Sequence, residues 1–162
     1  MKFRMLLSAL LLAAGVLFFA GCDKKAETKA ESKTDKNADT PTEVVNKYAA
    51  AMRKMDFAAA ARLCYGRQKE EIEDIGKQIA NIKAAADNGN ENARRLYEQR
   101  AKPGFAKFKI EIKSEKIEGD FAILDFVMHN PDDTVKEEKG YLKKINGEWK
   151  LISEKDYKPA KK

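Results

Sequence analysis

The sequence predicts an α+β fold in which N-terminal helices pack on a curved, four-stranded antiparallel sheet. Between residues 41 and 101, apolar residues recur three and four positions apart, which is the period of an amphipathic helix. From residue 106 onward, apolar and polar residues alternate, which is the period of a half-buried strand. Since the helical segments all precede the strand segments, the two kinds of element are segregated as in α+β domains.

The first helix is expected to begin at Pro41. Thr40 is a favourable N-cap residue, proline fits the first helical position, and Glu43 completes a capping box with Thr40. The apolar positions that follow are spaced so that they lie on one side of this helix. These positions are Val44, Val45, Tyr48, Ala49, Met52 and Met55.

Further helices are expected up to residue 101. Asp56 is placed to cap a short helix over residues 57–65. A longer helix is predicted over residues 68–88, and its isoleucines form a face that packs inside the domain. A coiled coil would need three or four heptads, and this segment has about two. A helix over residues 91–101 is expected to end at residues 102–104, because Lys-Pro-Gly interrupts helices.

Four strands are predicted in the last third of the chain. Residues 106–113 alternate strictly, while residues 121–128 are almost all apolar and are therefore a central strand. Residues 134–145 and 148–153 flank Asn146-Gly147, which is the strongest short signal for a hairpin. The four strands are expected to form a meander, since each follows the last after a short turn.

The Asn146-Gly147 turn also fixes how the last two strands pair. A two-residue turn places Lys144 opposite Trp149 and Leu142 opposite Leu151. Leu142, Trp149 and Leu151 then share one face of the sheet. Lys144 is expected to lie over the ring of Trp149 as a modest cation–π contact.

The N-terminus has the organisation of an export signal. Lys2 and Arg4 precede an apolar run over residues 5–20. This run is shorter than the roughly 20 residues that span a bilayer, and it fits the core of a signal peptide. The two small residues and the cysteine that follow resemble the lipobox of bacterial lipoproteins. The resemblance implies cleavage before Cys22 and acylation of its thiol; an ordinary secretory signal with a chance cysteine is the alternative.

These features divide the chain into a signal peptide over residues 1–21, a lipidated cysteine with a disordered linker over 22–40, a domain over 41–154 and a basic tail over 155–162. The linker lacks aromatic and large aliphatic residues, so it cannot bury a core. The lipid on Cys22 is expected to hold the protein on a bacterial membrane, facing the periplasm or the exterior. Asp23 resembles an inner-membrane retention signal that is not general among bacteria, so the choice of membrane stays open.

Charge and composition exclude several classes of partner. The net charge of +6 comes from basic and acidic residues that are interleaved, as on a solvated surface. A nucleic-acid partner is therefore not expected, because it would require basic residues gathered on one face. With Cys22 acylated, Cys64 has no disulfide partner and is expected to be buried. One histidine and one thiol cannot form a zinc site, and no cofactor-binding loop is present in the sequence, so no metal and no cofactor are expected.

The order of elements resembles the nuclear transport factor 2-like (cystatin-like) superfamily over about residues 41–154. The resemblance rests on the short second helix in Met55-Asp56-Phe57-Ala58-Ala59-Ala60 and on the final strand Gly147-Glu148-Trp149-Lys150-Leu151. More narrowly, the chain is similar to lumazine-binding-like lipoprotein domains of unknown function. The resemblance implies a cone, in which a curved sheet wraps over helices. It also implies a pocket at the wide end and, often, a dimer through the outer face of the sheet.

Residues at which a pocket or a ligand site is expected are Tyr48, Asp125, Tyr141 and Trp149. A buried Asp125 would have a raised pKa and could act as a general base. Aligning the apolar face of residues 108–112 with that of residues 122–128 places Asp125 on the opposite, outer face instead, as an ion pair with Lys113. A register shifted by one residue would place it inside. The ion pair is the favoured prediction, and no catalytic residue is predicted.

The favoured register leaves Phe121, Ile123 and Val127 on the outer face of the sheet, where they form a candidate dimer face. The expected function is that of a membrane-anchored envelope lipoprotein with a non-catalytic binding domain. Its partner would be an envelope protein, a wall component or a second copy. The alternatives are a receptor for a small apolar ligand held in the cone, or a pocket enzyme with Asp125 as its general base.

Overall fold

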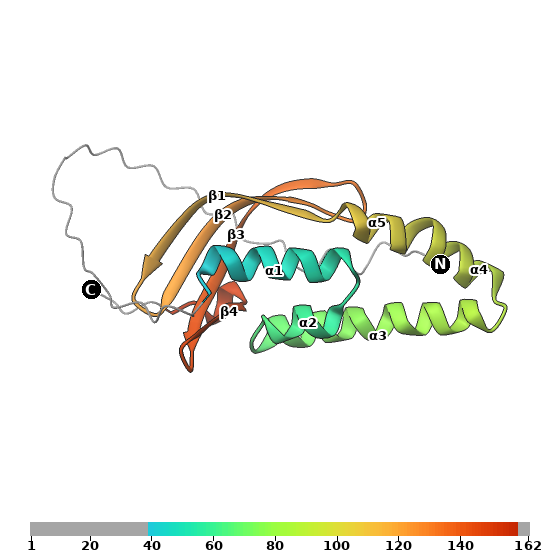
Figure 1. The fold of residues 1–162 in the computed structure, drawn as a ribbon, viewed down its shortest axis with the longest axis horizontal. Coiled ribbons are helices and arrows are strands. Elements are labelled where there is room, and N and C mark those ends of the chain that lie inside the picture. The colour runs from blue at the N-terminus through green and yellow to red at the C-terminus, as the bar shows by residue number, and fades with distance from the viewer. Residues whose placement is uncertain (1–38, 159–162) are drawn as a thin grey trace. The chain divides into compact units, whose positions relative to one another are not determined.

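A computed structural model describes residues 39–158 of the chain (Figure 1). The predicted signal peptide, Cys22 and all but the end of the predicted linker lie outside these residues. The helical part comprises α1 (Pro41–Arg53), α2 (Phe57–Arg62), α3 (Arg67–Asp87), α4 (Glu91–Leu96), a π-helical turn η1 (Tyr97–Ala101) and α5 (Lys102–Lys107). The strands are β1 (Lys109–Glu118), β2 (Phe121–His129), β3 (Val135–Ile145) and β4 (Glu148–Ile152), followed by a short 3-10 turn η2 (Glu154–Asp156).

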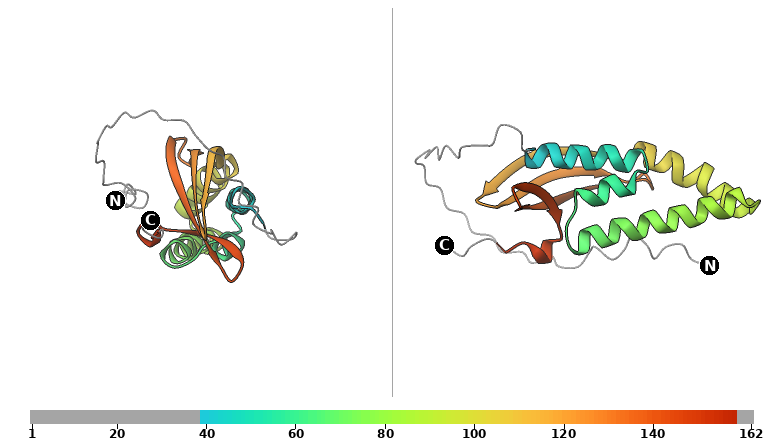
Figure 2. Two further views of the ribbon diagram at one scale, coloured as in Figure 1. Left: turned by 90° about the vertical axis from the view of Figure 1, so that its left-hand side faces the viewer. Right: turned by 60° about the horizontal axis from the view of Figure 1, so that its bottom comes forward.

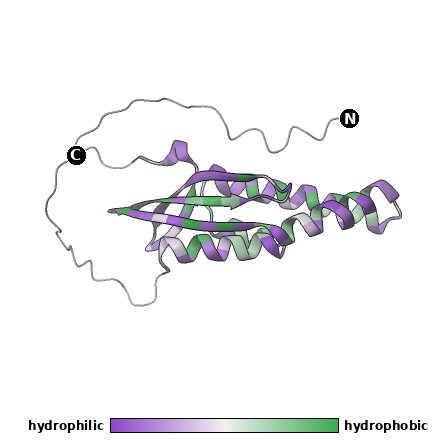
Figure 3. Ribbon diagram, turned by 90° about the horizontal axis from the view of Figure 1, so that it is seen from above, coloured by the Kyte–Doolittle hydropathy of each residue, from purple (hydrophilic) through white to green (hydrophobic). Residues whose placement is uncertain are grey.

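The strands form one antiparallel sheet in the order β1-β2-β3-β4, which confirms the predicted α+β class and the meander. Seen from above, the strands carry both polar and apolar segments (Figure 3). Burial alternates along β2, where Ala122, Leu124 and Phe126 are buried and the residues between them are half-buried, so the sheet has one covered and one open face. The Asn146-Gly147 turn has positive φ at both residues, as a type I′ turn requires. Lys144 pairs with Trp149 and Leu142 with Leu151, as predicted.

The starts of the first two helices follow from capping. The Thr40 hydroxyl accepts a hydrogen bond from the Glu43 amide at 3.2 Å, and the Thr40 amide donates to the Glu43 carboxylate at 2.7 Å. This reciprocal pair is the predicted capping box. Asp56 caps α2 by accepting from the amide of Ala59 at 2.9 Å.

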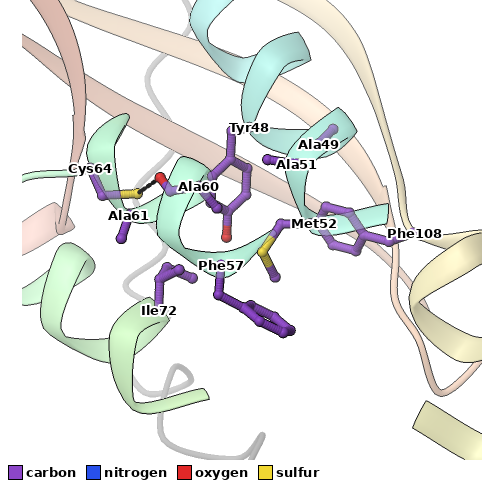
Figure 4. Close-up of a cluster of buried hydrophobic side chains, with 10 residues drawn as sticks. All are labelled: Tyr48, Ala49, Ala51, Met52, Phe57, Ala60, Ala61, Cys64, Ile72 and Phe108. Carbon is purple, nitrogen blue, oxygen red and sulfur yellow. Dashed lines mark hydrogen bonds between the residues drawn. The ribbon is translucent and has the colours of Figure 1, made fainter. Parts of the chain in front are cut away.

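Helix α1 lies between the inner face of the sheet and helices α2 and α3, and it contributes to both parts of the core (Figures 1 and 2). One part packs α1 against the sheet, and Leu124 and Leu142 at its centre are completely buried. Its other members are Val44, Val45, Ala122, Phe126 and Trp149. The other part packs α1 against α2, α3 and the start of β1 (Figure 4). It consists of Tyr48, Ala49, Ala51, Met52, Phe57, Ala60, Ala61, Cys64, Ile72 and Phe108.

The prediction that residues 102–104 end the helical region is wrong. The chain continues through η1 into α5, and the amide of Lys102 donates to the carbonyl of Tyr97, five residues back. Pro103 stands in the first turn of α5, where its missing N–H is tolerated. Gly104 is buried because the turn after β2 lies against it: a Cβ there would be 2.6 Å from the carbonyl oxygen of Pro131.

The first strand was expected over residues 106–113 and is instead β1, which starts three residues later and extends to Glu118. Phe108 still enters the core, as the cap of α5 rather than as a strand residue. A bulge falls between Ile112 and Ser114, so Lys113 has no partner in the register of β1 with β2. The bulge changes which β1 residue lies opposite Asp125.

The second helix was expected to reach residue 65 but ends at Arg62. Residues 63–65 run parallel to β4: the amide of Tyr65 donates to the carbonyl of Leu151, and the amide of Leu151 donates to the carbonyl of Leu63, both at 2.8 Å. This contact covers part of the edge of β4, which would otherwise present unpaired backbone groups.

Within residues 39–158, no helix is both long enough and apolar enough to cross a bilayer.

Replacing Gly104 with alanine is expected to destabilise the domain, although alanine favours helix formation by about 1 kcal/mol. The added methyl group would meet the backbone of Pro131, which cannot move aside as a side chain could. Urea unfolding should give a loss of about 1–3 kcal/mol, the usual effect of overpacking. A gain in stability would contradict the described contact.

The exposed Ala106 in the same helix is a matched control. Ala106→Gly should change stability by helix propensity alone, a loss of at most about 1 kcal/mol.

Candidate functional site

The four predicted pocket residues do not come together. Tyr48 and Trp149 are buried between α1 and the other elements of the core. Asp125 and Tyr141 lie on the opposite, outer face of the sheet. Because the sheet separates the two pairs, they cannot form one site.

Tyr48 is a core residue. Its ring packs edge-on against Phe108, with centroids 6.3 Å apart, and it points among Met52, Phe57 and Ile72 (Figure 4). Burial raises the pKa of its hydroxyl far above the ordinary value, and Cys64 and Glu71 add to the rise. A phenol that stays protonated at all physiological pH values in this position can support packing but not proton abstraction.

Cys64 is buried, as predicted, and its thiol donates to the carbonyl of Ala60 at 3.4 Å. Burial raises the pKa of the thiol to about 12. The thiolate is the reactive form of cysteine, so this residue is chemically inert.

Trp149 fills the inner face of β4 beside Leu142. The Nζ of Lys144 lies 5.9 Å from the ring centroid, which confirms the predicted cation–π contact. The indole therefore serves the core and is not open to a ligand.

Asp125 lies on the outer face of the sheet. It is therefore not in the interior position that a general base would need. Its carboxylate accepts from the Ser114 hydroxyl at 2.6 Å and from the Lys139 Nζ at 2.7 Å. The predicted partner Lys113 is displaced by the bulge and lies 3.8 Å from Glu111 instead. The hydrogen bond from Lys139, followed by that from Ser114, lowers the pKa of Asp125.

The outer side of β2 carries three apolar residues, with Asp125 between the second and the third, and most of the residues beside them on β1 and β3 are charged. Phe121, Ile123 and Val127 are half-buried there. Val127 lies between Glu111 of β1 and Glu137 of β3. Ile123 lies between Lys116 of β1 and Tyr141 of β3. We refer to this side of the sheet, which carries Phe121, Ile123, Asp125 and Val127 of β2 and the residues beside them, as the outer face.

The chain's own C-terminal segment covers part of the outer face. The Tyr157 ring lies edge-on against Phe121, with centroids 5.3 Å apart, and 5.0 Å from the Tyr141 centroid. Its hydroxyl donates to Glu118 at 3.1 Å, and the Tyr141 hydroxyl donates to Glu154 at 3.3 Å. The folded part of the chain therefore extends past the predicted boundary at Glu154.

His129 lies at the far end of the same face. Its Nε2 is 3.4 Å from a carboxylate oxygen of Glu111, which forms an ion pair only when the imidazole is protonated. Over the part of the chain that the structure describes, no three histidine, cysteine, aspartate or glutamate side chains gather as metal ligands would.

Two hollows lie on the helical side of the molecule. One, of about 520 Å³, is open to solvent and lies between α2, α3 and η1. Its lining includes the apolar or aromatic residues Met55, Phe57, Ile79 and Tyr97 and the charged residues Asp56, Glu73, Lys77 and Lys83. The other, of about 370 Å³, lies between α3 and α4 beside Ile82 and Leu96. Neither is lined by the inner face of the sheet, where side chains of the core fill the space under α1.

The sequence did not point to Tyr157, Ser114 or Lys139 as partners of the outer face. Tyr157 stands in a lysine-rich tail without periodicity, so nothing local indicates that it packs on the sheet. The only available signal was the apolar character of the outer side of β2, which must be covered by something.

No protein-family model matches the chain, and the search of curated proteins also gave no match. Three solved structures resemble it at low TM-scores. An NTF2-like candidate transpeptidase from Campylobacter jejuni is 12% identical, with a TM-score of 0.40 over 71% of this chain and 100% of that chain. An NTF2-like protein of unknown function from Cytophaga hutchinsonii is 15% identical, with a TM-score of 0.37 over 72% of this chain and 90% of that chain. A SEC-C motif-containing protein from Rhodopseudomonas palustris is 11% identical, with a TM-score of 0.42 over 70% of this chain and 76% of that chain.

The carboxyl pKa of Asp125, measured by NMR titration, is expected to lie below the ordinary value of about 3.9. Since the folded-state pKa is lowered, any stability from this group is present above the unfolded pKa and disappears as the pH falls through the folded one. Lys139→Ala should move the pKa back toward the ordinary value.

Lys143 is a matched control, because it lies on the same strand and face but contacts the Phe121 ring instead. Lys143→Ala should leave the Asp125 titration unchanged. A raised pKa of Asp125 in the native chain would contradict this expectation and support a role for Asp125 as a general base.

Proposed function

We propose that this chain is a lipid-anchored protein of the bacterial cell envelope whose domain binds another protein and does not catalyse a reaction. The observation that carries the binding role is the division of the sheet into a filled inner face and an outer face with apolar residues of β2. Tyr48 and Cys64 are buried as neutral side chains, and Asp125 is held in an exposed ion pair with Lys139. Neither arrangement supplies a poised catalytic group.

The anchor is proposed from the sequence at the N-terminus. The basic residues, the apolar run and the small residues before Cys22 together resemble a lipoprotein signal. A lipid at Cys22 would hold the domain on the export side of a membrane through the linker, and more than one acyl chain would make the attachment stable.

The outer face is the surface that we assign to the partner. A protein contact is favoured by an apolar centre with charged residues around it, which is the usual anatomy of such an interface. Val127 is the best probe of this face, because the Tyr157 ring contacts are with Phe121 and Tyr141, farther along the sheet.

A small apolar ligand is the second candidate, and the hollow between α2, α3 and η1 favours it. Its volume of about 520 Å³ lies within the range of small-molecule sites. Its aromatic walls, Phe57 and Tyr97, suit an apolar ring or chain. This site is on the helical side, not in the interior of the cone where the resemblance implied it.

A photo-crosslinking amino acid at Val127, in intact cells, is expected to trap a specific partner when Cys22 is native. With Cys22→Ser, the chain should carry no acyl chain and should keep its signal peptide, because acylation and the cleavage that follows both depend on the cysteine. Membrane fractionation and mass spectrometry of the products give both readouts.

Two positions serve as controls. Ile117 is also apolar and is 52% exposed, but it pairs with the inward-facing Ala122 and so belongs to the inner face of the sheet. A probe at Ile117 should therefore not give the Val127 product. Cys64→Ala should keep the chain on the membrane, since that thiol is buried. Identical products from both probes would contradict the contact face. A Cys22→Ser chain that is cleaved and held on the membrane just as the native chain is would contradict the anchor.

A further inference from the structure

Two unusual backbone conformations from distant parts of the chain meet at the larger hollow on the helical side. Met55 has a positive φ of 56°, and Tyr97 is the first residue of the π-helical turn η1. Both residues line the hollow, together with Phe57. Strained dihedral angles and π-helical turns cost stability, and both recur at functional sites. Their meeting at one hollow therefore favours a functional role for it.

The conformation of Met55 belongs to the end of α1. The amides of Met55 and Asp56 donate to the carbonyls of Met52 and Ala51, both at 3.0 Å. These two bonds form a Schellman motif, in which the residue of positive φ is usually glycine because a side chain there is strained. Methionine at this position therefore costs stability that glycine would not.

Local chemistry accounts for the other strained residues but not for Met55. Among residues 39–158, the other non-glycine residues with positive φ are Asp133 and Asn146. Aspartate and asparagine tolerate this conformation, because their short polar side chains bond to nearby backbone groups. The Met55 side chain instead packs partly on the helical core and lines the hollow. What methionine adds here is apolar contact, part of it at the wall of the hollow.

Tyr97 brings a ring and a hydroxyl to the hollow. The amide of Lys102 donates to the carbonyl of Tyr97, five residues back, so this turn holds one residue more than an α-helical turn. Within residues 39–158, the Tyr97 hydroxyl has no hydrogen-bond partner, although the residue is half-buried and such a phenol usually has one. The hydroxyl is therefore available to a ligand.

The charged residues of the lining are already paired. Each has a partner of its own: Lys77 with Asp74 at 2.9 Å, Lys83 with Asp87 at 2.6 Å, Glu73 with Lys69 at 3.7 Å, and Asp56 with the amide of Ala59 at 2.9 Å. Exposed pairs of this kind stabilise the fold little, but a charged ligand would find no unopposed charge in the lining. An uncharged ligand is therefore favoured.

The wall residues favour an aromatic ring over an aliphatic chain. The Met55 sulfur and the rings of Phe57 and Tyr97 all gain from contact with another ring. The Phe57 ring is held edge-on against Phe105, with centroids 5.3 Å apart. Because the hollow is open to solvent, a bound ring can also carry a polar group that reaches Tyr97 or water.

We propose that this hollow binds an uncharged aromatic molecule that carries a hydrogen-bonding group, with Met55 contacting its ring and Tyr97 its polar group. The inference rests on the second candidate function above, and it adds the chemical class of the ligand and the two residues that select it. It does not depend on the partner assigned to the outer face.

The test is a titration of the full chain in detergent, followed by NMR of its methyl groups. Benzophenone, an uncharged molecule with two aromatic rings and a carbonyl acceptor, should shift the methyl signals of Met55 and Ile79 but not that of Ile117 in the sheet. Two analogues should bind at least fivefold more weakly: 4-benzoylbenzoate, which adds a carboxylate, and dicyclohexyl ketone, which lacks the aromatic rings. Equilibrium dialysis gives the concentration of each compound outside the micelles.

Two variants test the assigned residues, with the Ile79 methyl group as the probe. Tyr97→Phe removes only the hydroxyl, and Met55→Gly removes the side chain at a position that suits glycine. Each should raise the dissociation constant of benzophenone at least fivefold. Tyr65→Phe and Asn146→Gly make the same changes away from the hollow and should leave it unchanged. Urea unfolding of each variant confirms that it is folded.

The outcomes separate this inference from the candidate function on which it rests. If none of the three compounds shifts the Met55 and Ile79 signals, the hollow is not a ligand site and both fail. If dicyclohexyl ketone or 4-benzoylbenzoate binds as tightly as benzophenone, the hollow remains a ligand site but the proposed class is wrong. Unchanged affinity in both Tyr97→Phe and Met55→Gly would overturn the roles of these residues.

Discussion

The contact between α1 and the inner face of the sheet determines what the rest of the molecule can do. Val44 and Val45 project from α1 onto the sheet, where Leu124 and Leu142 have no exposed surface. Burying a leucine side chain fully stabilises a fold by about 1.5–3 kcal/mol, so this layer is a major part of the domain's stability. The same α1 presents Tyr48 and Met52 on its other side to α2 and α3, and thereby joins the helical part to the sheet.

Because side chains fill this layer, chemistry and recognition are left to the outside of the molecule. The helical side has two hollows, and the outer face has apolar residues of β2 among charged residues that pair with one another. The edge of β4 is partly occupied by residues 63–65, and one end of the outer face is covered by Tyr157. The chain thus shields parts of its own sheet that would otherwise bind other chains.

Local signals in the sequence were enough for the caps and the last hairpin. Thr40, Glu43 and Asp56 act on amides within three residues, and Asn146-Gly147 fixes its register without help from other elements. Elsewhere, predictions from the sequence were wrong because the outcome depended on contacts between residues far apart in the chain. Gly104 stays helical because a backbone distant in sequence packs on it, and Asp125 pairs with Ser114 because a bulge shifts β1. Tyr157 belongs to a tail with no periodicity, so its position required the folded sheet.

The most direct measurement is the free energy of unfolding of Leu124→Ala in urea. If α1 packs the inner face without space, the cavity left by this truncation should destabilise the domain by about 2–5 kcal/mol. A loss below about 1 kcal/mol would mean that Leu124 lines an open interior, and the division into a filled inner face and a binding outer face would then be wrong.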